Sequence, residues 1–239
     1  MSRTWVIPDS HGCLFTFRTL VEDLIGLRQD DRLILLGDYI DRGPDSKRLI
    51  DYIIQLSAQG YEVSAIRGNH EDFLVKAWEA AMNPRGLMNL MSRKKLRNEW
   101  IESGGDTTLH SFGVDDMRLF PVSYIDWIKS LPLYVELDKF LVVHAGFNFD
   151  APDIFADEHA MMWIRDFKVI PEKINYRRII HGHVPVSLDF IHASLKSDAY
   201  HFIALDNGVY MTNRPGFGNL LALELSTREL LVQPNLDML

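Results

Sequence analysis

Five short segments of the chain are rich in Asp, Asn and His, the side chains that bind hard or borderline divalent cations. In chain order they are 8–12 (PDSHG), 37–43 (GDYIDRG), 68–71 (GNHE), 144–146 (HAG) and 181–183 (HGH). Each of the first three follows an apolar run, and such runs usually deliver the next residues to the end of a buried strand. Five such segments in order predict one binuclear metal site.

The first two segments suggest how two ions could share ligands. Asp9 and His11 are two residues apart, so both can bind one ion, and Asp38 at the next strand end could bridge both ions. Two ions about 3.5–4 Å apart lower the pKa of a shared water and favour in-line displacement at phosphorus. The pattern therefore predicts hydrolysis of phosphate esters.

The later segments supply the ligands of the second ion. We assign Asn69 and His144 to it, together with one histidine of the last segment. Spacing alone leaves His181 and His183 as alternatives. A lone Asp before Gly is usually a turn residue. Metal binding is favoured here because several candidate ligands occur together at predicted strand ends.

Composition limits the possible functions. The chain has 239 residues, 47% of them hydrophobic and 24% charged, which suits a single globular domain over 1–239 with a sizeable core. A net charge of −8 argues against a broad nucleic-acid-binding surface, which needs a basic patch. Phosphorylated substrates stay possible, because bound cations would supply positive charge locally.

Cysteine usage and the start of the chain favour a reducing compartment. Cys13 is the only cysteine, so an intrachain disulfide is excluded. It is either a reactive thiol beside the first metal segment or a small residue packed at a helix start, and we favour packing. The sequence lacks a secretory leader and any segment long enough to span a membrane. We therefore expect a cytoplasmic protein with no membrane partner.

Strand and helix patterns alternate along the first third of the chain. Apolar runs predict strands at 4–7, 32–36 and 61–66, each leading into a metal segment. Helical spacing predicts helices from residue 14 to Gly26 and over 49–56. This order predicts a mostly parallel sheet with its active loops at the carboxyl ends of the strands.

The character of the sequence changes between about residues 72 and 130. Helices are predicted over 73–78, with a break at 83–86, and over 121–129. Because neither end resembles a linker, we predict a helical insertion within the single domain. The basic run at 93–97 is interpreted as a solvated helix face, with a role in substrate access as the alternative.

The rest of the chain is rich in strand signals. They predict strands at 133–137, 140–143, 178–180, 200–205, 220–225 and 229–232. The second of these leads to His144 and the third to the last metal segment. The predicted fold is therefore α/β, a two-sheet β-sandwich flanked by helices.

The five segments resemble those of the metal-dependent phosphoprotein phosphatases, which are calcineurin-like metallophosphoesterases. That family's pattern is Gly-Asp-x-His-Gly, Gly-Asp-x-Val-Asp-Arg-Gly, Gly-Asn-His-Glu, His-Ala-Gly and a late Gly-His, and the match runs from Asp9 to about Gly208. Trp100, 104–105 (GG), 108–109 (TL) and 131–132 (LP) look like the bacterial serine/threonine phosphatase branch. Pro8 stands where the family has Gly, which removes a backbone N–H but no ligand.

The resemblance implies a role for each histidine near the centre. The bacterial branch reads Gly-His-Thr-Pro where this chain has 182–185 (GHVP), so His183 is the implied ligand. His181 would then pack or hydrogen-bond beside the ligands. His70 would be the general acid that protonates the leaving oxygen, paired with Asp41.

The resemblance also implies two phosphate-binding arginines. Arg42 lies in the long second segment, and Arg165 rests on the match of 163–165 (WIR) to Trp-Ser-Arg. Arg177 or Arg178 could replace Arg165. Guanidinium groups suit phosphoryl oxygens because they present planar forks of donors. Asp206, in a stretch that resembles the family's Asp-Thr-Gly, is expected to support structure and not to act in catalysis.

The function implied is a phosphatase acting on phosphoserine or phosphothreonine in proteins, with phosphotyrosine as a further possibility. A hydroxide bridging two divalent ions would attack phosphorus, with Mn favoured over Fe or Zn. The partner would be a phosphorylated protein or peptide.

Three rival functions are weighed against this one. Symmetrical diadenosine tetraphosphate hydrolases share the metal segments but tend to carry Gly-Asn-His-Asp and to lack the Asp before Arg, whereas this chain has Glu71 and Asp41. The acidic balance disfavours a nuclease. A non-catalytic phosphate-binding module would be expected to have lost a ligand or the acid, and all are present here.

Overall fold

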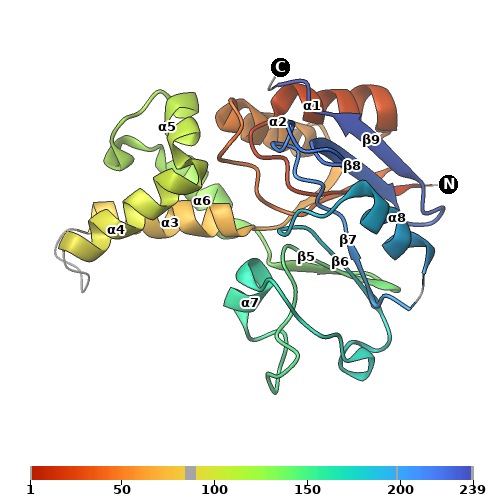
Figure 1. Cartoon of the computed structure of the whole chain (residues 1–239). Helices are drawn as coiled ribbons and strands as arrows, with labels where there is room; N and C mark the ends of the chain where they lie inside the picture. The colour runs from red at the N-terminus through yellow and green to blue at the C-terminus, as the bar shows by residue number, and fades with distance from the viewer. Residues whose placement is uncertain (1, 84–89, 198, 238–239) are drawn as a thin grey trace.

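The computed structural model describes residues 2–83, 90–197 and 199–237. Two β-sheets lie at the centre, with helices around them and a group of further helices to one side (Figure 1). This arrangement confirms the predicted α/β fold with two sheets flanked by helices. Part of the predicted helix break, residues 84–86, lies outside the described residues.

The first sheet has five strands in the order β3-β2-β1-β8-β9. They are β1 (Thr4–Ile7), β2 (Arg32–Leu35), β3 (Glu62–Ala65), β8 (Asn219–Glu224) and β9 (Leu230–Pro234). The first three are parallel, as predicted, but β8 runs antiparallel to both β1 and β9. The sheet is therefore mixed, because the short connection between β8 and β9 reverses the chain and pairs these strands as a hairpin.

The second sheet has four strands in the order β4-β5-β6-β7. They are β4 (Tyr134–Glu136), β5 (Phe140–Val143), β6 (Arg178–His181) and β7 (Phe202–Ala204), and only β4 is antiparallel to its neighbour. One buried cluster joins the two sheets, with Val6 and Ile34 from the first packing near Val142 and Ile180 from the second. Alternate strand residues thus form the inner layer of a sandwich.

Helices cover the outer faces of both sheets. On the first sheet lie α1 (Leu14–Thr19), which continues as a π-helix over Leu20–Ile25, and α2 (Ser46–Ala58). Gly26 ends the first of these in the left-handed conformation, as its position in the sequence predicted. On the second sheet lies α7 (Glu158–Trp163), while α8 (Leu188–Lys196) packs against β7. We did not predict α7 and α8, because six and nine residues show too little periodicity.

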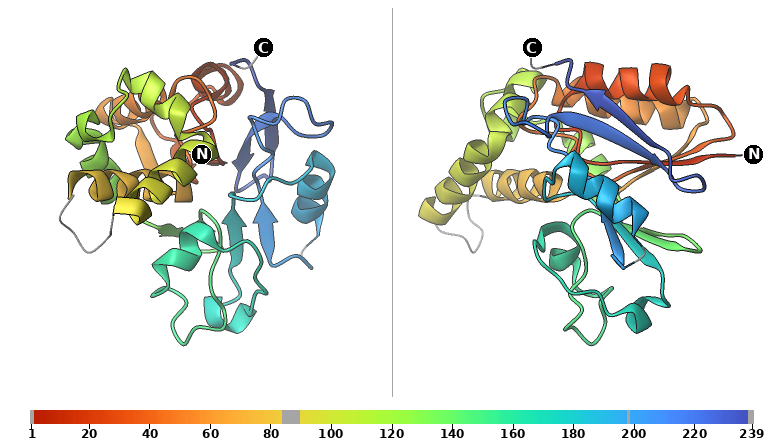
Figure 2. Two further views of the ribbon diagram at one scale, coloured as in Figure 1. Left: turned by 60° about the vertical axis from the view of Figure 1, so that its left-hand side comes forward. Right: turned by 45° about the vertical axis from the view of Figure 1, so that its right-hand side comes forward.

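Between β3 and β4 the described chain forms helices only. They are α3 (Asn69–Met82), α4 (Leu90–Trp100), a π-helical turn (Ile101–Gly105), α5 (Asp106–Phe112), a 3-10 turn (Met117–Leu119) and α6 (Val122–Ser130). Figure 2 shows them packed as one group beside the sheets. Lys94, Lys95 and Arg97 are exposed on α4, as expected for a solvated helix face.

The burial of Cys13 and the lengths of the helices bear on two predictions made from the sequence. Cys13 is fully buried, and burial raises the pKa of its thiol to about 12, which agrees with packing and not with a reactive thiol. None of the described helices is both long enough and apolar enough to cross a membrane.

The first turn of α1 is capped by a residue from the far end of the sequence. The carboxylate of Asp237 accepts hydrogen bonds from the backbone N–H of Phe15 and of Thr16, both at 2.9 Å, and from the Thr16 hydroxyl at 2.6 Å. These are donors that a helix start leaves without partners. The cap therefore ties the loop that carries the first metal segment to the last described strand.

We expect Asp237→Ala to lower the free energy of unfolding by about 1 kcal/mol, the usual effect of losing a helix cap. Chemical denaturation measures this. Asp30→Ala is the control, because Asp30 is exposed and its ion pair with Arg28 is long, at 3.7 Å. Equal effects of the two substitutions would contradict the capping role.

Candidate metal centre

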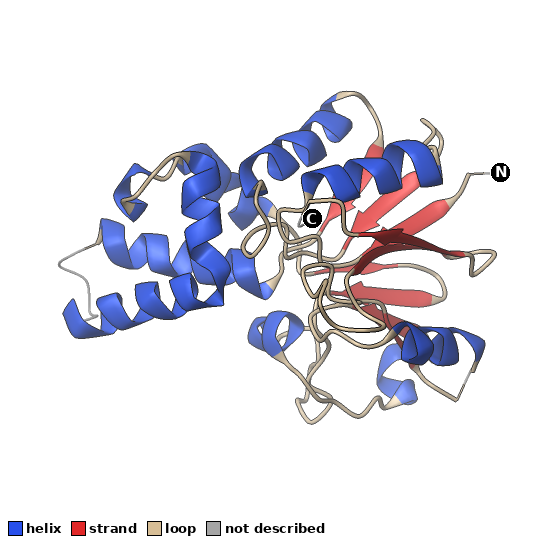
Figure 3. Ribbon diagram, turned by 45° about the horizontal axis from the view of Figure 1, so that its top comes forward, coloured by secondary structure: helices blue, strands red, loops and turns tan. Residues whose placement is uncertain are grey.

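The candidate ligands lie where parallel strands of both sheets end. Asp9 follows β1, Asp38 follows β2 and Asn69 begins α3 after β3, while His144 follows β5 and His183 follows β6. The connecting loops gather at this edge of the two sheets (Figure 3). Because carboxyl ends of parallel strands meet at one edge, residues up to 174 positions apart come into contact there.

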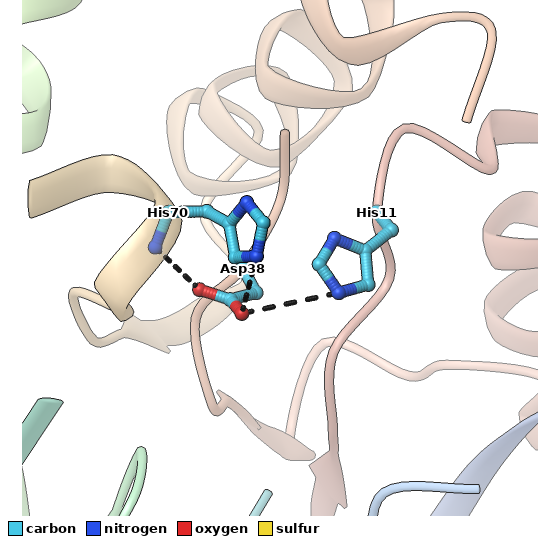
Figure 4. Close-up of side chains that lie close together, drawn as sticks. All are labelled: His11, Asp38 and His70. Carbon is cyan, nitrogen blue, oxygen red and sulfur yellow. Dashed lines mark hydrogen bonds and ion pairs between the residues drawn. The ribbon is translucent and has the colours of Figure 1, made fainter. Parts of the chain in front are cut away.

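Asp38 stands at the centre of this site. Its carboxylate forms one close group with His11 and His70, and a second with His144 and His183, all of them buried. Its Oδ2 lies 3.9 Å from Nε2 of both His11 and His70 (Figure 4). Its Oδ1 lies 3.6 Å from Nε2 of His144. Membership of both groups is the arrangement expected of a carboxylate that bridges two ions.

Backbone carbonyls determine which nitrogen two of the histidines present. His11 Nδ1 lies 2.9 Å from the carbonyl of Ile40, and His144 Nδ1 lies 2.8 Å from the carbonyl of Leu36. A carbonyl only accepts, so each Nδ1 carries the proton. Nε2 of both rings is left with its lone pair toward the centre, which is the usual tautomer of a metal-binding histidine.

Asn69, His144 and His183 approach one another closely in the second group. Asn69 Oδ1 lies 2.8 Å from His183 Nδ1, which can donate to it, and 2.9 Å from His144 Nε2. Because His144 Nε2 and Asn69 Oδ1 both present lone pairs, this contact is not a hydrogen bond and suits two ligands of one cation. Nε2 of His183 is buried and has no hydrogen-bond partner among the described residues. Buried polar atoms are nearly always paired, so this nitrogen fits a ligand to a divalent cation.

Asp9 is held beside the last segment and is not in either close group. Both of its carboxylate oxygens accept the backbone N–H of His183, at 3.2 and 3.0 Å. A Cβ on Gly182 would lie 2.1 Å from Asp9 Oδ1, so only glycine permits this approach. His181, by contrast, turns away and packs its ring against Phe167 and Phe202.

The electrostatics of the site also fit bound cations. Burial, followed by repulsion from Asp206 and Asp38, raises the pKa of Asp9. Burial likewise raises the pKa of Asp206 to about 7. Desolvation lowers the pKa of His11 and, to about 3, that of His183, so these imidazoles are neutral. Raised pKa values show that the ionised carboxylates of Asp9 and Asp206 are unfavourable in this buried site, and divalent cations would stabilise them.

His70 and Asp41 form a buried pair beside this centre. His70 Nδ1 lies 2.7 Å from Asp41 Oδ2. Burial alone would lower the pKa of His70, but the Asp38 charge and the Asp41 hydrogen bond raise it. Asp41 also accepts hydrogen bonds from Trp100 Nε1 at 3.0 Å and from the Thr108 hydroxyl at 2.6 Å. The resemblance to the bacterial branch includes Trp100 and Thr108 but implies no role for them, whereas the structure places both against Asp41.

Arg42 reaches the first group of ligands. Its Nη1 lies 3.1 Å from His11 Nε2, and its guanidinium lies 4.1 Å from the ring centre of Tyr210. The Tyr210 ring also meets the edge of His11, at 5.1 Å between ring centres. Tyr210 is a residue that sequence reasoning missed, because it lies outside every metal segment.

The structure separates the three candidates for the second arginine. Arg165 is exposed and close enough to His183 to contribute to lowering the pKa of that imidazole. Arg177 pairs with Glu136 at 2.6 Å, next to the amino end of β6. Arg178, the first residue of β6, donates to backbone carbonyls, that of Tyr200 at 3.1 Å among them. The effect of its charge on a candidate ligand favours Arg165 over the other two.

Two acidic residues support the loops. Glu71 accepts the backbone N–H of Asp38 and of Tyr39, both at 2.8 Å, and that of Gly68 at 3.0 Å. It thereby joins the second and third metal segments, a role that the motif alone did not reveal. Asp206 Oδ1 accepts the N–H of Gly208 at 2.7 Å, in agreement with the structural role predicted for it.

Five site residues have left-handed backbone conformations. They are His11, Asp38, Asp41, Arg42 and His183, with φ between 42° and 71°. Each costs about 1–2 kcal/mol relative to a right-handed conformation, although Asp and His tolerate this region better than most residues. Such strain persists only where the surroundings enforce it, and it is concentrated at functional sites.

The fold and the buried Asp/Asn/His cluster define an α/β protein built around a divalent-metal site. Residues 2–214 match the calcineurin-like phosphoesterase family, and the chain belongs to that family. It is therefore a metal-dependent phosphoesterase.

Curated relatives of this chain include bis(5′-nucleosyl)-tetraphosphatases of two kinds. The chain is 30% identical over 144 residues to the symmetrical bis(5′-nucleosyl)-tetraphosphatase of Nitrosomonas europaea, covering 60% of this chain but only 44% of that protein. It is 26% identical over 214 residues to the asymmetrical bis(5′-nucleosyl)-tetraphosphatase PrpE of Bacillus thuringiensis, covering 76% and 78%. A solved protein serine/threonine phosphatase of Saccharomyces cerevisiae shares the fold with a TM-score of 0.60, 15% identity, and coverage of 97% and 79%.

The last segment offers a matched pair of variants. We expect His183→Ala to lower the bound metal, because the His183 imidazole belongs to the second group of ligands and its Nε2 is buried without a partner among the described residues. His181→Ala should keep the wild-type metal content, because that ring packs against aromatic side chains. Elemental analysis after dialysis measures both. Metal loss in the His181 variant alone would reverse the assignment.

Proposed function

We propose that this phosphoesterase removes phosphate from phosphorylated protein side chains. The observation that supports the proposal is the His70–Asp41 pair, with 2.7 Å between Nδ1 and Oδ2. A serine or threonine alkoxide is a poor leaving group and needs a proton as the P–O bond breaks. Cleavage of a phosphoanhydride releases a stabilised phosphate oxygen and depends less on such a donor.

Each residue of the site has a part in this chemistry. Bound divalent cations supply the Lewis acid and the activated water for attack on phosphorus. His70, with Nδ1 turned to Asp41, presents Nε2 to the leaving oxygen as proton donor. Asp41 orients the imidazole and stabilises its protonated form. Arg42 and Arg165 bind the phosphoryl oxygens.

Further parts of the proposal concern the ion and the location. Asp, Asn and His ligands suit Mn, with Fe or Zn as alternatives. A phosphorylated protein or peptide is the expected partner, and a cytoplasmic location is consistent with the single buried cysteine.

Hydrolysis of dinucleoside polyphosphates is the second candidate function. It is favoured by two curated relatives that carry the name bis(5′-nucleosyl)-tetraphosphatase, one of them aligned over 76% of this chain. Two residues favour the first function over this one: Asp41 directly before Arg42, and Glu71 where these hydrolases tend to carry Asp.

A side-by-side assay separates the two functions. We expect Mn-loaded protein to release phosphate from phosphoserine and phosphothreonine peptides with a higher kcat/KM than it cleaves diadenosine tetraphosphate. His70→Asn should lower the peptide kcat by about 100-fold or more, the usual contribution of a general acid, while metal content stays near wild type.

Two outcomes of this assay would contradict the proposal. A much higher kcat/KM for diadenosine tetraphosphate would replace the first function with the second. Unchanged peptide turnover by His70→Asn would remove the acid assignment and leave the metal site standing.

Metal binding should stabilise the fold, because both sheets contribute ligands. At a free ion concentration of 100 times Kd, binding to the folded state adds about 2.7 kcal/mol. We expect Mn to raise the Tm of chelator-treated protein in circular dichroism melts, and to raise it less in His183→Ala. An equal rise with sodium chloride at matched ionic strength would show that the effect is not specific binding.

A further inference from the structure

The second metal segment is held by residues that lie far from it in the sequence. Asp41 and Arg42 have φ angles of 68° and 71°, and the Asp41 side chain is fully buried. Neither residue is a glycine, so neighbouring groups must keep this segment in the left-handed region. The neighbours come from the helical residues between β3 and β4.

Thr108 binds Asp41 twice. Its hydroxyl accepts the backbone N–H of Asp41 at 2.9 Å and donates to Asp41 Oδ1 at 2.6 Å. The Ser46 hydroxyl lies 3.1 Å from the Thr108 hydroxyl oxygen, and it accepts the backbone N–H of Asp41 at 3.2 Å. With Oδ1 engaged in this way, the carboxylate has one preferred rotation and turns Oδ2 to the imidazole of His70.

Trp100 acts on the other carboxylate oxygen. Its ring is fully buried, and its Nε1 donates to Asp41 Oδ2 at 3.0 Å. The same Oδ2 lies 2.7 Å from His70 Nδ1. Both oxygens of Asp41 therefore have donors before any substrate arrives, and water is excluded from them.

Gly104 supports the next residue. Its carbonyl accepts the backbone N–H of Arg42 at 3.1 Å. Gly104 has a φ of +105°, and a Cβ there would lie 2.7 Å from Arg42 N and 2.8 Å from Arg42 Cγ. Gly105 lies against the Trp100 ring just as closely, because a Cβ on it would lie 2.4 Å from the nearest ring atom. The turn over Ile101–Gly105 thus brings Trp100 and Gly104 to the site together.

We propose that Trp100, Gly104 and Thr108, termed the Asp41 support, are positioning residues for catalysis. They set the rotation of the Asp41 carboxylate, and through it the imidazole of His70, and they hold the backbone of Arg42. This inference rests on the proposed role of His70 and Asp41 in protonating the leaving group. It gives the helical residues between β3 and β4 a part in the chemistry as well as in the fold.

The test uses two variants that each remove one donor to Asp41: Thr108→Val keeps the shape of the side chain, and Trp100→Phe keeps an aromatic ring of smaller size. Thr108→Val and Trp100→Phe should lower kcat for a phosphoserine peptide by about tenfold, a fraction of the full general-acid effect. For p-nitrophenyl phosphate, whose leaving group needs no proton, the loss should be less than about threefold. KM and metal content should stay near wild type for both substrates.

A double-mutant cycle shows whether the effect passes through Asp41. If it does, Asp41→Asn combined with Thr108→Val is no slower than Asp41→Asn alone. Trp78→Phe is the matched control, because the Trp78 indole nitrogen is buried with no hydrogen-bond partner among the described residues. That variant should keep wild-type kcat for both substrates.

A structural readout that does not need activity completes the test. In proton NMR spectra the Trp100 indole N–H, identified among the five tryptophans by its absence in Trp100→Phe, should be shifted downfield and exchange slowly. Asp41→Asn should move it, because the acceptor changes from a carboxylate to an amide.

The outcomes are distinguishable. Equal losses for both substrates, or losses that add to that of Asp41→Asn, would mean that the support is structural only, and would overturn this proposal while leaving the acid assignment intact. Full activity of His70→Asn would overturn both. A Trp100 proton that is unaffected by Asp41→Asn would refute the contact itself.

Discussion

The carboxylate of Asp38 is buried between two groups of imidazoles, one on each side. A buried carboxylate is costly unless it is paired or binds a metal. The backbone N–H of His70 donates to Oδ1 at 3.0 Å, and Glu71 fixes the backbone of Asp38 itself. The position of this one side chain therefore determines how the loops after β2 and β3 run, and where the histidines delivered by β5 and β6 can meet them.

Strain and close packing are features of the same loops. The left-handed residues at the strand ends turn the chain sharply enough to point Asp and His inward, and they are held there by contacts from distant elements. Gly182 against Asp9 and Gly104 against Arg42 show how this is done: backbone approaches side chain at distances that leave no room for a Cβ. The stability given up locally is supplied by the buried layer between the two sheets.

Much of this could be predicted from sequence, and the limits have physical reasons. Strands and candidate ligands were visible because an apolar run followed by a polar segment is a local pattern. The antiparallel pairing of β8 with β1 was not visible, because the two strands lie far apart in the sequence. The contacts of Trp100 and Thr108 with Asp41 span 59 and 67 residues, so no local pattern encodes them. The choice between Arg165 and Arg178 as the second phosphate-binding arginine likewise depends on the direction of β6, because Arg178 lies at its amino end and the candidate ligands lie beyond its carboxyl end.

The pairing of β1 with β8 has a consequence for how the chain folds as it is made. Val6 is paired with Leu223, so at 5–20 residues per second roughly 10–40 s of synthesis separate the two strands. During that interval β1 can pair with β2 on one side only, and its other edge is open to intermolecular association. The ligands that follow the first three strands can come together early. The free edge of β1 is covered only when β8 pairs with it, after nearly all of the described chain has left the ribosome. Chaperone binding in that interval would protect the nascent sheet.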